Sequence, residues 1–280
     1  MELASSRGAL WLLRLFFVLL CVFLYVPLIV LVVFSFNDGD VTFPLQGFTL
    51  SWYSRAAENP ALIAALERSA IVATVTSVLA VALGVLASYA LVRRAFRGKS
   101  AFAALVFSPL VIPYLVFGIA LLVLFKLIDK VLITVAGTYI DVGMHAVIIG
   151  HVVVALPYTI LTILPLLERL STSLEEAAHD LGASPWKTFW RVTFPLLMPA
   201  LVSAFLIAFT LSFDEYAIAS FLAGSQVTWP VFLFAQLRVP SQLPELVAVS
   251  SVILVISVGL VVAAEFGRQR SERRVEAPVE

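Results

Sequence analysis

Six long runs of apolar residues are separated along the chain by segments that are richer in polar residues. A helix needs about 20 apolar residues to cross the hydrocarbon core of a bilayer. Backbone amides and carbonyls find no water inside lipid, so each run is expected to be a helix. The sequence therefore predicts an all-α, polytopic membrane protein with six transmembrane helices. The expected spans are residues 15–36, 69–92, 101–125, 145–167, 196–222 and 246–266.

The composition agrees with a membrane protein rather than a soluble domain. Hydrophobic residues make up 61% of the 280 residues, and charged residues only 13%. A soluble domain has too little interior to hide so many apolar side chains. The first run, behind Arg7 and Arg14, is about 22 residues long, whereas the apolar part of a signal peptide has about 7–15. We therefore expect the first run to be a retained span.

The basic residues favour one orientation. Thirteen of the 18 lysines and arginines lie before the first span or after the second, fourth and sixth spans. Only five lie on the other side, in segments 37–68, 126–144 and 223–245. Because cytoplasmic loops are rich in Lys and Arg, both termini (1–14 and 267–280) are expected in the cytoplasm, with the chain in the inner (plasma) membrane. The net charge is zero, so the charge balance does not predict nucleic-acid binding. The apolar spans make membrane lipid the expected surrounding.

The loop at 168–195 has the pattern of two short amphipathic helices. Ser173 stands three residues before Glu176, the spacing of a capping box at a helix start. Gly182 suits the end of that helix, and Ser184-Pro185 suits the start of a second one. The second helix carries apolar aromatic residues beside two basic ones. Its apolar side could lie on lipid headgroups, on other helices of the chain, or in a groove of a soluble partner.

The same loop resembles a known family motif. Glu176-Ala177-Ala178, three residues, Gly182, nine residues and then Val192-Thr193-Phe194-Pro195 are similar to the EAA motif of binding-protein-dependent ABC importer permeases. The motif usually ends in Ile-x-Leu-Pro, and Val192 and Phe194 replace its Ile and Leu. The resemblance covers a permease domain at about 67–266, with five of the six spans.

This resemblance implies that the loop is a coupling helix that docks on a separate ABC ATPase. Glu176 would contact the ATPase, Ala177 and Ala178 would allow close approach, and Gly182 would form the bend. Glu175 and Trp186 are expected beside the same contact. The implied partners are ABC ATPase subunits, a second homologous permease subunit and an extracytoplasmic solute-binding protein.

The chain lacks a phosphate-binding loop of its own, which needs two glycines with four residues between them and Lys-Ser/Thr directly after the second. Before Gly98-Lys99-Ser100, Arg93 stands where the first glycine should be, and Trp186 replaces the glycine before Lys187-Thr188. We therefore expect no catalytic residue and no cofactor in this chain. ATP and Mg²⁺ would be used by the partner ATPase, and the chain is expected to be a permease subunit, not an enzyme.

The histidines and the cysteine do not form a metal-binding pattern. His145 and His151 are six residues apart, so they do not share a helix face, and neither has the spacing of a zinc ligand. They are expected to be hydrogen-bonded interior or interfacial residues. Cys21 is the only cysteine, so it cannot form an internal disulfide.

Asp214, Glu215 and Tyr216 form a polar group inside the fifth expected span. Carboxylates in a span are costly and usually face protein or water. Adjacent helical residues point about 100° apart, so the two acids are expected to have different surroundings. They could line the route of a cationic solute, or they could hydrogen-bond to neighbouring helices or hold a closed gate.

A second resemblance concerns the solute. Leu211–Gly224, followed by Gln236-Leu237-Arg238 and Pro244, is similar to spermidine/putrescine-type permeases. It implies a polyamine solute, attracted by acidic and aromatic side chains, and a heterodimer with a paralogous permease. An importer for another small solute, or a stand-alone channel or ion-coupled carrier, would also fit the spans. A membrane enzyme would need catalytic groups that the spans lack.

Overall fold

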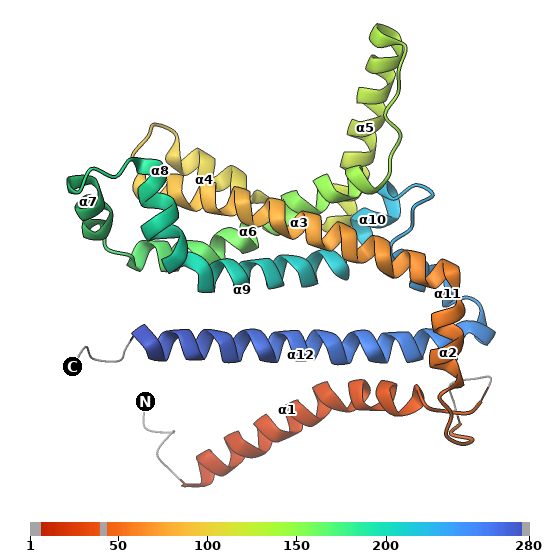
Figure 1. Ribbon diagram of the computed structural model, residues 1–280. Coiled ribbons are helices and arrows are strands. Elements are labelled where there is room, and N and C mark those ends of the chain that lie inside the picture. Colours follow the sequence, from red (N-terminus) through yellow and green to blue (C-terminus); the bar gives the residue numbers. More distant parts are fainter. Residues whose placement is uncertain (1–6, 40–43, 276–280) are drawn as a thin grey trace. The chain divides into compact units, whose positions relative to one another are not determined.

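The computed structural model describes residues 7–39 and 44–275. Within these ranges the chain is helical, and the only β-type pairing is an isolated bridge between Asn37 and Phe48 (Figure 1). The outer ends of the expected cytoplasmic termini, 1–6 and 276–280, lie outside the described residues. The chain divides into two compact units, one of residues 1–60 and 235–256, the other of 61–234 and 257–280.

The first unit is held by polar contacts at the end of its first helix. It contains α1 (Arg7–Phe34), α2 (Ser51–Glu58), the turn η3 (Pro240–Gln242) and the start of α12 (Leu243–Val275). The Tyr53 hydroxyl of α2 lies 2.7 Å from the Ser35 hydroxyl and 3.1 Å from that of Ser251 in α12. The indole of Trp52 donates to the Asn37 carbonyl at 2.7 Å. These bonds fix the chain where it leaves α1.

The second unit has three helices at its centre, α3 (Pro60–Arg93), α6 (Met144–Arg169) and α9 (Phe194–Phe213). They run side by side (Figure 1) and meet at three buried alanines, Ala80, Ala155 and Ala208. Small side chains let helix backbones approach closely, which is the usual basis of helix packing in membranes. The Thr159 hydroxyl of α6 also donates to the Ala80 carbonyl of α3 at 3.0 Å.

The third expected span is not one continuous helix. Residues 101–125 fall on α4 (Lys99–Phe107), the turn η1 (Ser108–Leu110) and α5 (Tyr114–Ala136). The two helices meet at 107° (Figure 1). Pro109 and Pro113 lie at the break, and a proline removes a backbone donor and disfavours helix at the residue before it. The described residues thus contain five helices long and apolar enough to cross a membrane, or six if this bent pair is one span.

The fifth expected span, 196–222, is also interrupted. A short helix, α8 (Pro185–Thr188), and a π-helical turn, η2 (Phe189–Thr193), lead into α9. The α9 helix ends at Phe213, and a separate short helix, α10 (Ala217–Leu222), follows. The sequence is then helical again in α11 (Trp229–Gln236). Asp214 and Glu215 therefore lie at a break between two helices, and not within one helix as expected.

Close packing between α3 and α6 gives a stability prediction. A Cβ atom on Gly84 would lie 2.5 Å from the Thr159 hydroxyl oxygen and 3.0 Å from its Cβ. Gly84→Leu is expected to destabilise the protein by about 1–3 kcal/mol, because the packed helices would have to move apart. The thermal midpoint of the purified protein in detergent, followed by gel filtration after heating, measures this. Gly259→Leu is the control, since a Cβ there meets nothing within 4 Å. Equal midpoints for the two variants would contradict the packing argument.

Candidate functional site

The loop between α6 and α9 begins with a helix whose cap differs from the expected one. This helix, α7, spans Thr172–Asp180, and its N-cap is Ser171, whose side chain accepts from the Ser173 amide at 3.2 Å. The expectation that Ser173 is the cap is wrong. Leu170 already has an extended backbone, so the chain turns out of α6 there, and Ser171 is the residue placed to cap the next helix.

The bend and the second helix of the loop agree with the sequence prediction. Gly182 has φ +80°, in the left-handed region that glycine adopts at low cost. The Ala183 amide donates back to the Ala178 carbonyl at 2.9 Å, as at a glycine-terminated helix. Ser184 then accepts from the Lys187 amide at 3.4 Å, and Pro185 begins α8. The prediction of two short helices joined at a glycine is confirmed.

The outer side of this loop is apolar and uncovered within its own unit. Leu181 is 89% exposed and Trp186 is 70% exposed, although both are large apolar side chains. Glu176 and Ala177 are exposed, and Ala178 is half-buried. Within the described residues Glu176 forms no hydrogen bond or ion pair. The loop thus presents an apolar tip and a free carboxylate to whatever lies beside it.

Glu175 has the opposite orientation to its neighbour. Its Oε1 accepts from Nε of Arg93 at 3.3 Å and from the Thr193 hydroxyl at 3.2 Å. The Glu175 side chain is only 15% exposed. The two adjacent glutamates, which the sequence placed at one contact, therefore lie in different environments. No local sequence signal indicates the contacts of Glu175, because Arg93 and Thr193 are 82 and 18 residues away from it in the sequence.

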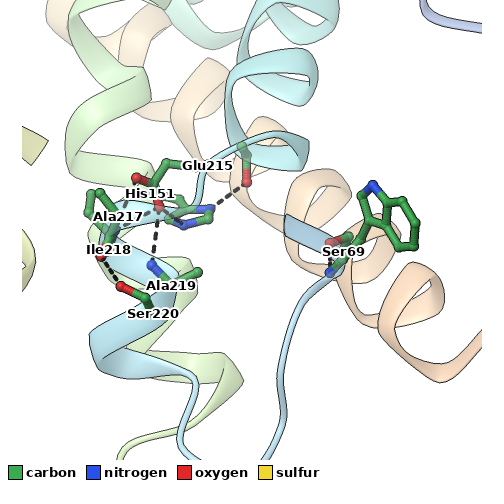
Figure 2. A network of polar contacts seen from close by, with 9 residues as sticks. Ser69, His151, Glu215, Ala217, Ile218, Ala219 and Ser220 are labelled. Atoms are coloured by element: carbon green, nitrogen blue, oxygen red, sulfur yellow. Dashed lines mark hydrogen bonds and ion pairs between the residues drawn. The ribbon is translucent and has the colours of Figure 1, made fainter. Parts of the chain in front are cut away.

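A second polar group lies at the break after α9. The buried carboxylate of Glu215 accepts from the Ile218 amide at 2.9 Å and from the Ala219 amide at 3.1 Å, and so caps the start of α10. Nε2 of His151 in α6 donates to the same carboxylate at 3.1 Å, and its Nδ1 lies 2.8 Å from the Ser212 hydroxyl. Figure 2 shows this network between α6 and the break. The expectation that His151 is a hydrogen-bonded interior residue is confirmed.

Asp214 differs from Glu215, as expected for two acids with separate surroundings. Its side chain is exposed and forms no hydrogen bond or ion pair in the part of the chain that the structure describes. Two positions on, the Tyr216 ring stacks on Phe234 with centroids 4.2 Å apart. A row of stacked phenylalanines on α9 leads toward the same break: Phe205, Phe209 and Phe213. An exposed carboxylate and several aromatic rings therefore occur together at this end of α9.

The comparison with protein families decides what kind of chain this is. Residues 80–277 match the family described as the binding-protein-dependent transport system inner membrane component. The chain belongs to this family. It is a multi-pass permease subunit of an ABC importer, a transport component that works with a separate ATPase.

Two relatives from Escherichia coli K12 match most of the permease. The putrescine transport system permease protein PotI is 37% identical over 234 residues, which are 83% of this chain and 82% of PotI. The spermidine/putrescine transport system permease protein PotC is 32% identical over 244 residues, covering 87% of this chain and 88% of PotC. These relatives match nearly full length, so the similarity extends well beyond the loop motif.

Solved transporters share the fold of the permease. A bacterial ABC transporter involved in the import of the acidic polysaccharide alginate matches with a TM-score of 0.67 at 21% identity, covering 92% of this chain and 98% of the other. The MetNI methionine ABC transporter in an inward-facing conformation matches with a TM-score of 0.55 at 19% identity, covering 77% of this chain and 96% of the other. The helical architecture is therefore that of ABC importer membrane subunits.

Proposed function

We propose that this permease imports polyamines of the putrescine and spermidine type. The observation that carries the proposal is the near full-length similarity to PotI and PotC, whose names give those solutes. The site chemistry supports it. A polyamine is an alkyl chain with two or more ammonium groups, and the break after α9 offers an exposed carboxylate at Asp214 beside the stacked rings of Tyr216 and Phe234. Ammonium groups are attracted both to carboxylates and to aromatic faces.

The free carboxylate of Asp214 also argues for an aqueous or protein-lined route at this point. An ionised side chain that faces lipid is costly, whereas one that faces water or a solute path is not. Glu215 is not part of this route in the proposal, because its carboxylate is buried and accepts hydrogen bonds from three donors among the described residues. Asp214 is thus the acid that would meet the solute.

The proposed assembly follows the family. ABC ATPase subunits would dock on α7 and α8, a second homologous permease would complete the path as a heterodimer, and an extracytoplasmic binding protein would deliver the solute. Both termini and the α7–α8 loop would be cytoplasmic, in agreement with the distribution of basic residues. The ATPase would use ATP and Mg²⁺, and its closure would switch the permease between inward-open and outward-open states.

Asp214→Asn is expected to lower putrescine uptake about tenfold at limiting concentration, while the ATPase stays bound. Loss of one charge-assisted contact is worth about 1.5–3 kcal/mol, and 1.4 kcal/mol is a factor of ten. The measurement is uptake of radiolabelled putrescine by vesicles that contain the complete transporter and binding protein.

Thr210→Val is the matched control for this variant. Thr210 is exposed one turn earlier on α9, and its hydroxyl already donates to the Leu206 carbonyl, so uptake should stay unchanged. Unaltered uptake by Asp214→Asn at limiting putrescine would remove Asp214 from the route. Failure of the parent transporter to take up putrescine or spermidine, with uptake of another solute, would overturn the polyamine assignment.

A further inference from the structure

Arg93 and Glu175 form an ion pair at the junction of the membrane helices with the α7–α8 loop. Arg93 is the last residue of α3, and its Nε donates to Oε1 of Glu175 in α7 at 3.3 Å. The two side chains are only 10% and 15% exposed. A pair so little exposed to water is screened less by salt than a surface pair and holds a more defined geometry.

The same two side chains reach the two other central helices. Nη2 of Arg93 donates to the carbonyl of Leu170, the first residue after α6, at 2.8 Å. The Thr193 hydroxyl, in the π-helical turn that leads into α9, donates to Oε1 of Glu175 at 3.2 Å. Thr193 is buried, at 2% exposed. The cluster of Arg93, Glu175 and Thr193 therefore joins α7 to the ends of α3, α6 and α9.

The backbone segments that connect α7 to the rest of the chain are not helical, so they cannot transmit a movement of α7 rigidly. At its start, Leu170 and Ser171 are extended and not helical. At its end, Gly182 has a left-handed backbone, and a Cβ there would meet nothing within 4 Å. A helix held only by such links could rock on a partner without moving the membrane helices. The side-chain cluster supplies the stiff connection that these links lack.

We propose that the Arg93–Glu175–Thr193 cluster is the joint that transmits movement of α7 to α3 and α9. The inference rests on the proposed docking of an ATPase on α7 and α8. The two adjacent glutamates then have different roles. Glu176, which is exposed, faces the partner, whereas Glu175, whose side chain is only 15% exposed, faces the membrane helices. Glu175 and Arg93 are thus positioning residues, and neither contacts the solute or ATP.

The test follows movement of α9 separately from ATP hydrolysis. In the complete transporter this subunit carries Cys21→Ser and Thr210→Cys, so that its single thiol lies on the exposed side of α9 and labelling is read on this subunit alone. The rate of reaction with a water-soluble maleimide is measured with and without ATP plus vanadate, which traps the closed ATPase. Trapping is expected to change this rate in the parent. In Glu175→Gln and in Arg93→Gln this trapping-induced change in the maleimide reaction rate should be at least fivefold smaller, while the rate of ATP hydrolysis stays within twofold of the parent.

Two further variants separate transmission from a purely structural role. Arg93→Lys keeps the charge and should retain at least half of the trapping effect. Glu168→Gln is the control, because Glu168 is exposed at the end of α6 and has no hydrogen bond or ion pair within the described residues; it should behave as the parent. If a single variant does not fold, the double variant Arg93→Gln/Glu175→Gln, which leaves no unpaired charge, should fold and lose the trapping effect.

The outcomes are distinguishable from failure of the proposed function. A parent that retains no ATPase, or shows no response to trapping, would refute the docking itself. If ATP plus vanadate changes the maleimide reaction rate in the single variants, or in the double variant, as much as in the parent, the cluster does not transmit the movement. Loss of the ATPase from the Glu175→Gln complex would also overturn it, because Glu175 would then be a docking contact.

Discussion

His151→Leu is expected to cost about 3–5 kcal/mol of stability and to leave little assembled protein. The substitution removes the side chain that donates to the buried Glu215 carboxylate. A buried carboxylate left without its partner strongly destabilises the folded protein. The Ser212 hydroxyl loses its contact at the same time. The midpoint of thermal unfolding and the yield of monodisperse protein in detergent measure the effect.

His145→Leu provides the matched control for this substitution. His145 lies on the same helix but is exposed, and its ring forms an edge-to-face contact with that of Phe125, with centroids 6.2 Å apart. Its replacement should change the midpoint by less than about 0.5 kcal/mol in equivalent stability. Equal midpoints for the two histidine variants would mean that the network at the break after α9 does not hold α6 and α10 together.

Glu176→Lys is expected to release the ATPase and to abolish most ATP-dependent uptake. Reversal of a charge at a docking contact costs about 2–5 kcal/mol, which is more than a tenfold loss of affinity. The fold of the permease should be unaffected, because Glu176 is exposed and makes no bond within the described residues. The ATPase retained per permease after affinity purification measures the effect.

Glu168→Lys tests whether any reversed charge near the loop would act in the same way. Glu168 is also exposed, but it lies on α6 before the loop begins. It should retain the ATPase. Retention of the ATPase by Glu176→Lys, at the level of the parent, would show that Glu176 is not a docking contact.

Apolar run length predicted the membrane helices well where the helix is continuous, as in α6, which is unbroken although it contains Pro157 and Pro165. The second expected span lies within α3, which begins nine residues before it and ends one residue after it. The fourth lies within α6, which adds one residue at its start and two at its end. The prediction of one continuous helix for the third span was wrong, because run length takes no account of the two prolines between α4 and α5. The prediction for the fifth span was wrong for another reason. The Glu215 carboxylate accepts hydrogen bonds from the Ile218 and Ala219 amides and so starts a new helix, and a hydropathy pattern does not indicate such contacts.

The candidate site was predictable where its signals are local and not where they depend on tertiary contacts. Gly182 and Ser184-Pro185 were located correctly, because turn and cap chemistry acts over a few residues. The pairing of His151 with Glu215, 64 residues apart, was not predicted. The available signal was that a histidine and a glutamate, both rare inside membranes, each need a polar partner within their spans. The inward orientation of Glu175 likewise depends on where α3 ends.

Photo-crosslinking from the tip of the α7–α8 loop tests the central claim most directly. Leu181 is 89% exposed at the bend, so a photoreactive amino acid at this position reports what covers the loop in membranes that contain the whole transporter. We expect a crosslinked product that contains the ATPase subunit, formed in the parent and lost in Glu176→Lys. Crosslinks to lipid alone, with an intact transporter present, would contradict the assignment of this loop as the docking element for an ATPase.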